Sequence, residues 1–327
     1  MAEDWQKLRV LVAGCGSIGK RHARVLREIG VQTLFAADPV AAQVAAAAKE
    51  TRFDATAESF EAGLALKPQA VVLCTPPALH VPQAVQALEA GCHVFSEKPL
   101  SVDLRGVPEL ERTMTRTGLT FAVGLCFRWH DGLLRAREIL RSGRIGRLAA
   151  IRSLMGEHLP DIRPDYRDLY IAKSNGAFEL MHDIDLCLWY AGQDVQSVCG
   201  TYGGFSDIGI QAPDLVEMVM VFPDRCVASV HLDFFEQPRR RQIELLGTRG
   251  TLTVEFASWT ECTVSVFDQE SRDWQVETIT TDRDDMFRDQ DSAFLRAAAG
   301  LETVTCTLAE ARKSLRAVLM LQGKETR

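Results

Sequence analysis

The sequence predicts an α/β protein with two domains. The first is a doubly wound parallel sheet, and the second is an α+β domain with an open, mostly antiparallel sheet. Over the first 125 residues, short apolar strand patterns alternate with helical patterns, as in a parallel sheet covered by helices. From Val195 onward strand patterns dominate, and pairs of them flank short turns, which indicates antiparallel hairpins. The pattern changes near Leu125, so we expect domains at residues 1–125 and 126–327.

The elements of the first domain follow from apolar runs and from helix boundary signals. A helix begins directly at a glycine-rich turn after the first strand, and Pro82 suggests the start of another. The expected strands are residues 9–13, 31–37, 53–55, 70–74, 93–96 and 120–124. The further expected helices are residues 41–50, 58–66, 82–90 and 103–117.

The second domain combines helices with hairpins. An irregular proline-rich loop is expected at residues 160–173, and a strong helical pattern runs from Asn175 to Tyr190. Residues 218–222 with 227–232, and residues 242–246 with 251–256, are the two expected hairpins. The other expected helices are residues 133–142, 287–299 and 308–321.

Composition excludes several functional classes. The net charge of −7 disfavours nucleic acid or an anionic membrane surface as the main partner. No apolar run reaches the ~18 residues of a membrane span, and the acidic N-terminus lacks the apolar region of a signal peptide. Nine cysteines without Cys-x-x-Cys spacing indicate reduced thiols in a cytoplasmic protein, and no metal site is expected.

The glycine turn carries the first functional signal. Gly14-x-Gly16-x-x-Gly19 stands between a strand and a helix, as in dinucleotide-binding folds of the Rossmann type. In that arrangement Gly14 permits the turn, Gly16 lets a pyrophosphate approach the backbone, and Gly19 lets the helix lie close to the sheet. The alternative is an ordinary glycine-rich β–α turn.

Asp38 strengthens the nucleotide hypothesis. It ends the second strand about 20 residues beyond Gly19, where an acid commonly binds the ribose 2′-hydroxyl. A carboxylate there repels a 2′-phosphate and so favours NAD over NADP, although Lys20 and Arg21 are basic. The alternative is that Asp38 caps the helix that follows Pro39.

Two stretches suggest catalytic chemistry. Lys98 follows a strand at the edge where open parallel sheets bind ligands, and its charge could stabilise a developing alkoxide. His182 lies at helical spacing from Glu179 and Asp185, which would suit proton transfer near neutral pH. The alternatives are that Lys98 is a solvated loop lysine and that His182 is a structural histidine. For each residue, the local evidence supports the functional and the structural interpretation about equally.

The ordered set of motifs resembles the glucose–fructose oxidoreductase/inositol 2-dehydrogenase (Gfo/Idh/MocA) family. The resemblance runs from the first strand to Gly192 and continues more weakly to the end of the chain. The motifs are Gly14-x-Gly16-x-x-Gly19 with Arg21-His22, Thr75-Pro76 with His80, Glu97-Lys98-Pro99, Phe127-Arg128-Trp129-His130, Tyr166 to Tyr170, and Gly176 through His182-Asp183-Ile184-Asp185 to Gly192.

This resemblance implies an NAD(P)-binding Rossmann domain followed by an α/β domain with an open antiparallel sheet. It also implies hydride exchange between nicotinamide and a carbinol carbon, usually of a sugar, polyol or sugar derivative, and with Asp38 we expect NAD rather than NADP as cofactor. Lys98 and His182 would face the substrate, with Asp185 and Arg128 also binding it. The expected cofactor-binding residues are Gly14, Cys15, Gly16, Ser17, Ile18, Gly19, Asp38, Thr75, Pro76, His80, Glu97 and Lys98.

The chain departs from the family pattern at one position. Many members carry an aspartate four residues before the histidine, where this chain has Phe178. The acid instead lies three residues before it, as Glu179, which we include among the expected catalytic residues. This is closer to a branch with Asp-x-Ser-His-Glu-x-Asp, in which Glu179 and Met181 replace Asp and Ser; that branch often acts on sugars or sugar nucleotides.

The sequence therefore predicts an NAD-dependent oxidoreductase acting on a hydroxyl or keto carbon of a sugar, polyol or sugar nucleotide. One alternative is an NAD-dependent glycosidase that oxidises its substrate transiently, so that NADH does not accumulate. Another is a non-catalytic NAD-sensing protein, which would need neither Lys98 nor His182. We also expect a homodimer or homotetramer formed through the C-terminal sheet.

Overall fold

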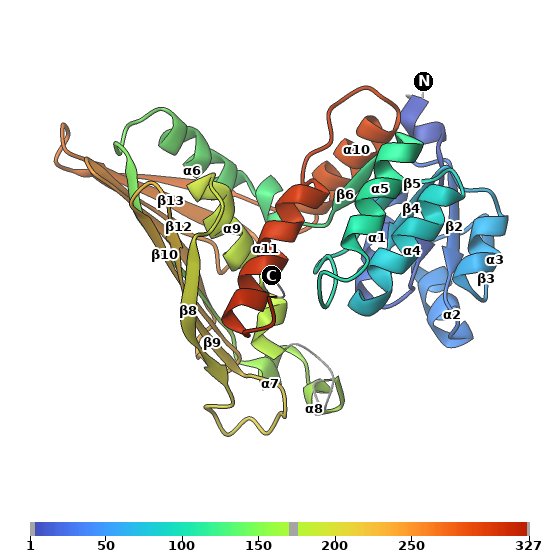
Figure 1. Ribbon diagram of the computed structural model, residues 1–327, viewed down its shortest axis with the longest axis horizontal. Helices are drawn as coiled ribbons and strands as arrows, with labels where there is room; N and C mark the ends of the chain where they lie inside the picture. Colours follow the sequence, from blue (N-terminus) through green and yellow to red (C-terminus); the bar gives the residue numbers. More distant parts are fainter. Residues whose placement is uncertain (1–3, 170–175, 326–327) are drawn as a thin grey trace. The chain divides into compact units, whose positions relative to one another are not determined.

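The computed structural model describes residues 4–169 and 176–325. The chain forms two compact units (Figure 1). The first unit comprises residues 1–126 and 284–315, and the second comprises residues 127–283 and 316–327. The expected single second domain, 126–327, is therefore interrupted, because residues 284–315 return to the first unit. In the part of the chain described, no helix is long and apolar enough to cross a membrane.

The first unit contains a six-stranded parallel sheet in the order β3-β2-β1-β4-β5-β6. This order reverses between β1 and β4, which confirms the predicted doubly wound sheet of the Rossmann type. Its strands are β1 (Arg9–Ala13), β2 (Thr33–Ala37), β3 (Ala55–Ala57), β4 (Ala70–Leu73), β5 (His93–Ser96) and β6 (Phe121–Val123).

Helices cover the sheet of the first unit on both faces. Val10 and Val12 of β1 lie in one core with residues of the first helix, whereas Leu11 approaches Gly63 of a helix on the other face. The helices are η1 (Asp4–Lys7), α1 (Ser17–Glu28), α2 (Ala41–Glu50), α3 (Phe60–Ala65), α4 (Pro77–Glu89), α5 (Val107–Thr117), α10 (Asp285–Ala298) and α11 (Leu308–Leu321), of which α11 belongs to this unit up to Leu315.

Some expected boundaries differ from the structure. Helix α4 begins at Pro77 and contains Pro82 in its interior, whereas we had expected it to begin at Pro82. Because Pro82 is in the second turn of the helix, its missing N–H removes only a bond near the helix start, where Pro76 is already the N-cap. Strand β3 begins at Ala55, two residues later than predicted.

The return of residues 284–315 has an apolar basis. Phe294 and Leu295 of α10 are 3% and 0% exposed and lie in the core that contains Phe95 of β5. The Phe294 and Phe95 ring centroids are 5.6 Å apart. Helix α10 also packs against α1. The sequence periodicity predicted this helix, but it carries no information on which sheet the apolar face covers.

A buried ionic network joins the same elements. The His22 side chain of α1 is fully buried, and its Nδ1 lies 2.9 Å from Asp291 Oδ2 on α10. Its Nε2 lies 3.1 Å from Glu97 Oε1, just beyond β5. Burial alone would lower the pKa of His22, but the two carboxylates raise it to about 10. The imidazolium therefore links α1, α10 and the end of β5.

The second unit contains an eight-stranded sheet in the order β14-β13-β12-β11-β7-β10-β9-β8. Strands β7 and β10 are parallel and all other neighbours are antiparallel, which confirms a mostly antiparallel sheet and both predicted hairpins. The strands are β7 (Leu148–Gly156), β8 (Ser197–Gly203), β9 (Leu215–Phe222), β10 (Cys226–Asp233), β11 (Arg240–Gly247), β12 (Gly250–Glu255), β13 (Glu261–Asp268) and β14 (Trp274–Thr280).

Helices lie on one side of this sheet (Figure 1). Helix α9 packs on β7 and β10, and α6 packs on β12 and β13. Strand alternation leaves side chains such as Val221 and Val227 exposed, at 38% and 39%. The helical elements are η2 (Cys126–Trp129), α6 (Asp131–Arg141), α7 (Leu159–Ile162), α8 (Tyr166–Leu169), η3 (Gly176–Leu180) and α9 (His182–Ala191).

The first prediction concerns His22. Because its folded-state pKa of about 10 exceeds the unfolded value near 6.5, its charge stabilises the fold fully below about pH 6.5. That contribution is lost as the pH rises toward 10. We expect His22→Gln to cost about 3–5 kcal/mol at pH 6. The difference in the free energy of unfolding between this variant and the unsubstituted protein, measured by urea unfolding, should narrow steadily up to pH 9.5. A difference independent of pH would contradict the charged network.

Candidate functional site

The glycine turn at the end of β1 is fixed by close backbone contacts. A Cβ atom at Gly14 (φ +93°) would lie 2.5 Å from the Cys74 carbonyl oxygen at the end of β4. At Gly19 a Cβ would lie 1.8 Å from the Gly14 carbonyl oxygen. These distances exclude any side chain, so both glycines are required for α1 to start this close to the sheet.

Gly16 differs because space lies beside it. A Cβ built there meets no heavy atom within 4 Å, so the missing side chain leaves the backbone open. Gly16 is the N-cap of α1, and the helix starts at Ser17 without a side-chain cap. The first N–H groups of α1 and its dipole therefore suit a phosphate group at this point. This cradle fits the pyrophosphate of a dinucleotide.

Asp38 lies beside the glycine turn. Its Oδ2 accepts a hydrogen bond from the Cys15 N–H at 2.7 Å, and its Oδ1 accepts one from the Val40 N–H at 2.8 Å. Helix α2 begins at Ala41 with Val40 as N-cap, so the alternative assignment of Asp38 as a helix cap is wrong. The side chain is half-buried and joins the end of β2 to the turn after β1.

Cys15 is a structural residue of this turn. It is 1% exposed, and burial together with Asp38 raises the pKa of its thiol to about 11. A thiol held protonated is a poor nucleophile. Its contribution to a cofactor site would therefore come from the backbone.

The loop after β4 is held by His80. This side chain is 1% exposed, and its two ring nitrogens each lie 2.8 Å from a carbonyl oxygen, of Thr75 and of Pro99. Burial lowers the pKa of His80. Thr75 donates its hydroxyl to Gln83 Oε1 at 2.6 Å, while Pro76 is exposed. His80 therefore ties the loop after β4 to the loop after β5, which contains Lys98.

Lys98 is half-buried and follows Glu97 directly. Glu97 Oε2 accepts the backbone N–H of Lys98 at 3.1 Å, while Oε1 contacts His22. Gly124 gives this carboxylate room, because a Cβ there would lie 2.6 Å from Glu97 Oε1. Although burial raises it, the pKa of Glu97 is lowered overall by His22 and Lys98. An ionised, fixed carboxylate thus orients the backbone of Lys98.

In the second unit, the helix expected from Asn175 to Tyr190 is interrupted. Asn175 lies outside the described residues, the 3-10 turn η3 covers Gly176–Leu180, and α9 starts at His182. Gly176 adopts φ +56° against Pro213, whose carbonyl oxygen accepts the Ala177 N–H at 2.8 Å. Because η3 is wound as a 3-10 turn and α9 begins only at His182, Glu179 does not share an α-helical face with His182 as predicted.

Two carboxylates in the first turn of α9 hold its start in place. Asp185 forms a two-pronged pair with Arg128, from Nε to Oδ2 and from Nη2 to Oδ1, each at 2.8 Å. Asp183 accepts from Ser153 Oγ at 3.0 Å and from Arg241 Nη2 at 2.5 Å. Both acids are at most 1% exposed and favour the positive end of the helix dipole.

His182 directly precedes Asp183 in the sequence, at the first residue of α9, and is half-buried. Its ring centroid is 4.9 Å from that of Phe127. Glu179 is also half-buried, but on η3. The structure thus supports His182 rigidly through its neighbours, which suits a group that must hold or move a proton.

Sequence reasoning missed a cationic cluster beside His182. Arg241 lies over the Phe127 ring at 3.7 Å from its centroid, and Arg239 lies over Trp259 at 4.6 Å. Arg239-Arg240-Arg241 is a basic run in a chain of net charge −7. That run was the available signal, because strand alternation predicts that Arg241 points to the opposite face from Arg240.

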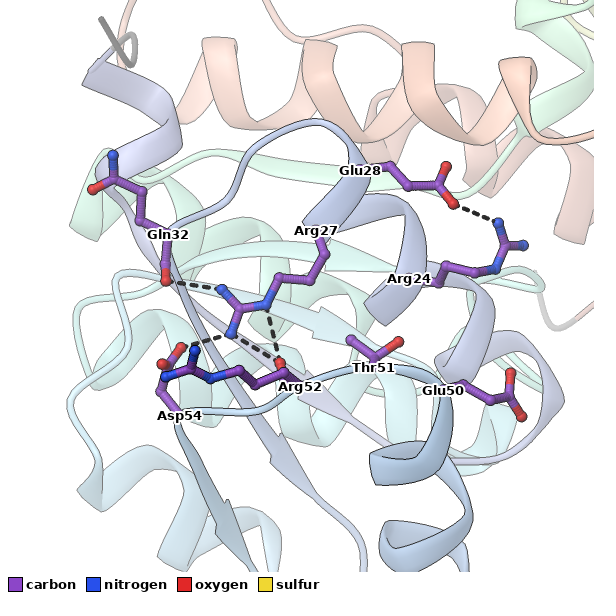
Figure 2. Close-up of a pocket in the computed structure, with 8 residues that line it drawn as sticks. All are labelled: Arg24, Arg27, Glu28, Gln32, Glu50, Thr51, Arg52 and Asp54. Atoms are coloured by element: carbon purple, nitrogen blue, oxygen red, sulfur yellow. Dashed lines mark hydrogen bonds and ion pairs between the residues drawn. The ribbon is translucent and has the colours of Figure 1, made fainter.

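A pocket in the first unit lies away from the glycine turn. Figure 2 shows that its lining comes from the C-terminal half of α1, from Gln32 just before β2, from the end of α2 and from the segment between α2 and β3. The glycine turn instead follows the end of β1. Arg27 is saturated there by the carbonyl oxygens of Arg52 and Gln32 and by Asp54. Three arginines and three carboxylates balance in the lining, so the pocket has no evident catalytic group.

One group of possible metal ligands occurs among the described residues. Atoms of His231, Asp233 and Glu236 lie within 4.8 Å of one another. His231 is already bridged to Asp233 at 2.9 Å and to Glu217 at 2.5 Å. These carboxylates raise the pKa of His231 to about 9, whereas a metal needs the neutral ring. We interpret the group as an ion-pair cluster.

Comparison with known proteins gives the family context. Residues 8–125 match the GFO/IDH/MocA family model, described as an oxidoreductase family with an NAD-binding Rossmann fold, and residues 133–253 match the GFO/IDH/MocA C-terminal domain. The chain is 34% identical to an inositol 2-dehydrogenase of Leifsonia xyli subsp. xyli over 197 residues, which cover 58% of this chain and 56% of that relative. It is 29% identical to an inositol 2-dehydrogenase of Corynebacterium glutamicum over 222 residues, covering 65% and 64%.

These matches span between half and two thirds of the length of the two relatives. A crystal structure of scyllo-inositol dehydrogenase from Lactobacillus casei, with bound NAD(H) and scyllo-inositol, superposes with a TM-score of 0.81. It is 22% identical and covers 97% of this chain and 96% of that one, which shows a shared fold. Since the two family models together match most of the chain, this protein belongs to the GFO/IDH/MocA family of oxidoreductases.

Proposed function

We propose that this protein is an NAD-dependent oxidoreductase acting on a hydroxyl or keto carbon of a sugar, polyol or sugar nucleotide. The observation that carries the proposal is the open backbone at Gly16, at the start of α1 and beside Asp38. The inositol dehydrogenases among its relatives support the choice of reaction and of substrate class. When bound, NAD supplies the nicotinamide that exchanges a hydride with the carbinol carbon.

The first unit would hold the cofactor. The N–H groups at the start of α1 bind the pyrophosphate, and Asp38 accepts hydrogen bonds from the ribose. Both cations near the glycine turn are already paired with carboxylates, which supports a preference for NAD over NADP. Lys20 pairs with Glu50 at 3.1 Å, and Arg21 lies 3.4 Å from Asp284.

Lys98 and His182 would act on the substrate oxygen. In the oxidative direction His182 accepts the hydroxyl proton, and the Lys98 ammonium stabilises the negative charge that develops on the oxygen. The Arg128–Asp185 pair positions the polyol and supports the start of α9. Glu179, on the neighbouring turn η3, stays a predicted catalytic residue.

We further propose that the exposed face of the second unit's sheet joins copies of the chain. Val221, Val227 and Val276 are 38%, 39% and 63% exposed, and such apolar side chains favour self-association. The assembly would be a dimer or a tetramer.

Substitution of Asp38 tests the cofactor site. Asp38→Asn keeps the shape of the side chain but removes its charge, so NAD should bind about 10- to 100-fold more weakly and the preference over NADP should shrink. Calorimetric titration with both dinucleotides measures this. Glu61→Gln, exposed on α3, is the matched control. Unchanged NAD affinity in Asp38→Asn would remove this residue from the site.

Substitution of Lys98 tests the reaction. Lys98→Met should lower kcat by about 10²–10⁴-fold, because the developing charge loses its cation, while the Kd for NAD changes little. NADH formation is followed with a panel of sugars, polyols and sugar nucleotides. Lys49→Met, exposed on α2, serves as control.

The same assay separates the alternatives. Undiminished turnover in Lys98→Met would exclude Lys98 from the mechanism. NAD-dependent cleavage of a glycoside without accumulation of NADH would identify a glycosidase. NAD binding without turnover of any member of the panel would favour the non-catalytic role.

A further inference from the structure

One edge of the second unit's sheet gathers arginine and aromatic side chains. The strand pairs Gly156↔Arg240, Gln242↔Glu255 and Glu261↔Thr280 bring the end of β7, the start of β11, the end of β12, the start of β13 and the end of β14 to the same edge. The residues just beyond these strand ends include Glu157, Arg239, Trp259 and Arg283.

Two guanidinium groups lie over one indole ring at this edge. Arg239 Cζ is 4.6 Å from the ring centroid of Trp259, and Arg283 Cζ is 4.2 Å from it. Arg239 Nε lies 3.4 Å from Glu157 Oε2, and its Nη1 donates to the Ala257 carbonyl oxygen. The planar guanidinium is therefore held in one orientation, as bidentate recognition of an oxyanion requires.

Arg239 and Arg241 each have an N–H donor without an acceptor in the described part of the protein. Within residues 4–169 and 176–325, no protein group accepts from Nη2 of Arg239, and Nε of Arg241 is buried without a partner. Arg239 is only 19% exposed in its side chain, and Arg241 is 5% exposed. Burial and the like charge of Arg241 lower the pKa of Arg239. An anion at this place would satisfy donors and relieve the repulsion between the two charges.

The cluster adjoins His182 within the same unit. The Phe127 ring lies 4.9 Å from His182 and 6.3 Å from Trp259, centroid to centroid, and Arg241 lies over that ring at 3.7 Å. Phe127 thus contacts both the histidine and Arg241. A sugar-sized molecule that reaches His182 can extend a charged substituent to Arg239.

We propose that the substrate carries an oxyanion, a carboxylate or a phosphoryl group, bound by Arg239 beside Trp259. This inference rests on the proposed function and names the substrate class of that site. The shared chemistry is an anionic group with two or more oxygen atoms, which can accept a pair of N–H hydrogen bonds from one guanidinium. A sugar acid and a sugar phosphate both supply it.

The test compares charged sugars with neutral counterparts in the NAD-loaded protein. Galacturonate is paired with galactose, and glucuronate and glucose 6-phosphate are paired with glucose. We expect the best charged member to exceed its neutral partner about tenfold or more in kcat/KM, or in affinity measured by calorimetry. A preference for the acids indicates a carboxylate site, and a preference for the phosphate indicates a phosphoryl site.

Variants locate the effect. Arg239→Gln should reduce the ratio of kcat/KM for the charged substrate to kcat/KM for its neutral partner about tenfold. Arg239→Lys should restore part of this ratio. Arg240→Gln removes the same charge one residue away, from a side chain that is 51% exposed, and should leave the ratio unchanged. The thermal midpoint of each variant verifies that it is folded.

The outcomes separate this inference from the proposed function. The anion site would be overturned if charged and neutral sugars gave equal kcat/KM and affinity. It would also be overturned if Arg239→Gln and Arg240→Gln changed the ratio of charged to neutral kcat/KM equally. Calorimetric binding of a charged sugar that depends on Arg239, without NADH formation, would support the anion site and contradict the proposed oxidoreductase. Turnover of neutral sugars alone would support the proposed oxidoreductase and contradict the anion site.

Discussion

The first unit depends on one buried charge, the imidazolium of His22. It lies between Glu97 and Asp291 without exposure to solvent, and it joins a helix, a strand end and a segment about 270 residues away in sequence. A buried ion pair contributes little net stability compared with apolar packing, but removing one partner leaves an uncompensated charge. The network therefore specifies how α10 is placed against α1. It also fixes Glu97, which orients the backbone of Lys98.

Support of this kind recurs in the second unit. Asp183 and Asp185 follow His182 in the sequence and are bound by Arg241 and Arg128. Lys98 and His182 are thus half-buried, while an acid next to each in the chain, Glu97 and Asp183, is buried and ionically paired. Such rigid surroundings allow a lysine or histidine to keep one geometry while its own charge changes. Arg241, which binds Asp183, also acts electrostatically on Arg239 of the proposed anion site.

Local patterns predicted much of the fold. The apolar runs 70–74 and 93–96 indicated buried strands, and the glycine spacing indicated the turn whose close contacts at Gly14 and Gly19 the structure confirms. Predictions failed where distant residues decide. The chain forms the 3-10 turn η3 where the helix from Asn175 was expected, with the Ala177 N–H bonded to Pro213, and α10 packs against Phe95 in the first unit. The candidate site divides in the same way: the glycine turn, Asp38, Lys98 and His182 were predicted from spacing and resemblance, whereas the roles of Asp291 and Arg239 could be seen only in the structure.

The charge state of His22 is the central claim, and nitrogen NMR of the imidazole tests it directly. In protein with ¹⁵N-labelled histidine, the His22 ring should show two protonated nitrogens from pH 6 to pH 9 and titrate near pH 10. His22→Gln identifies the signal by its loss. A ring with one protonated nitrogen at pH 8, titrating near 6.5, would show a neutral His22 and contradict the account.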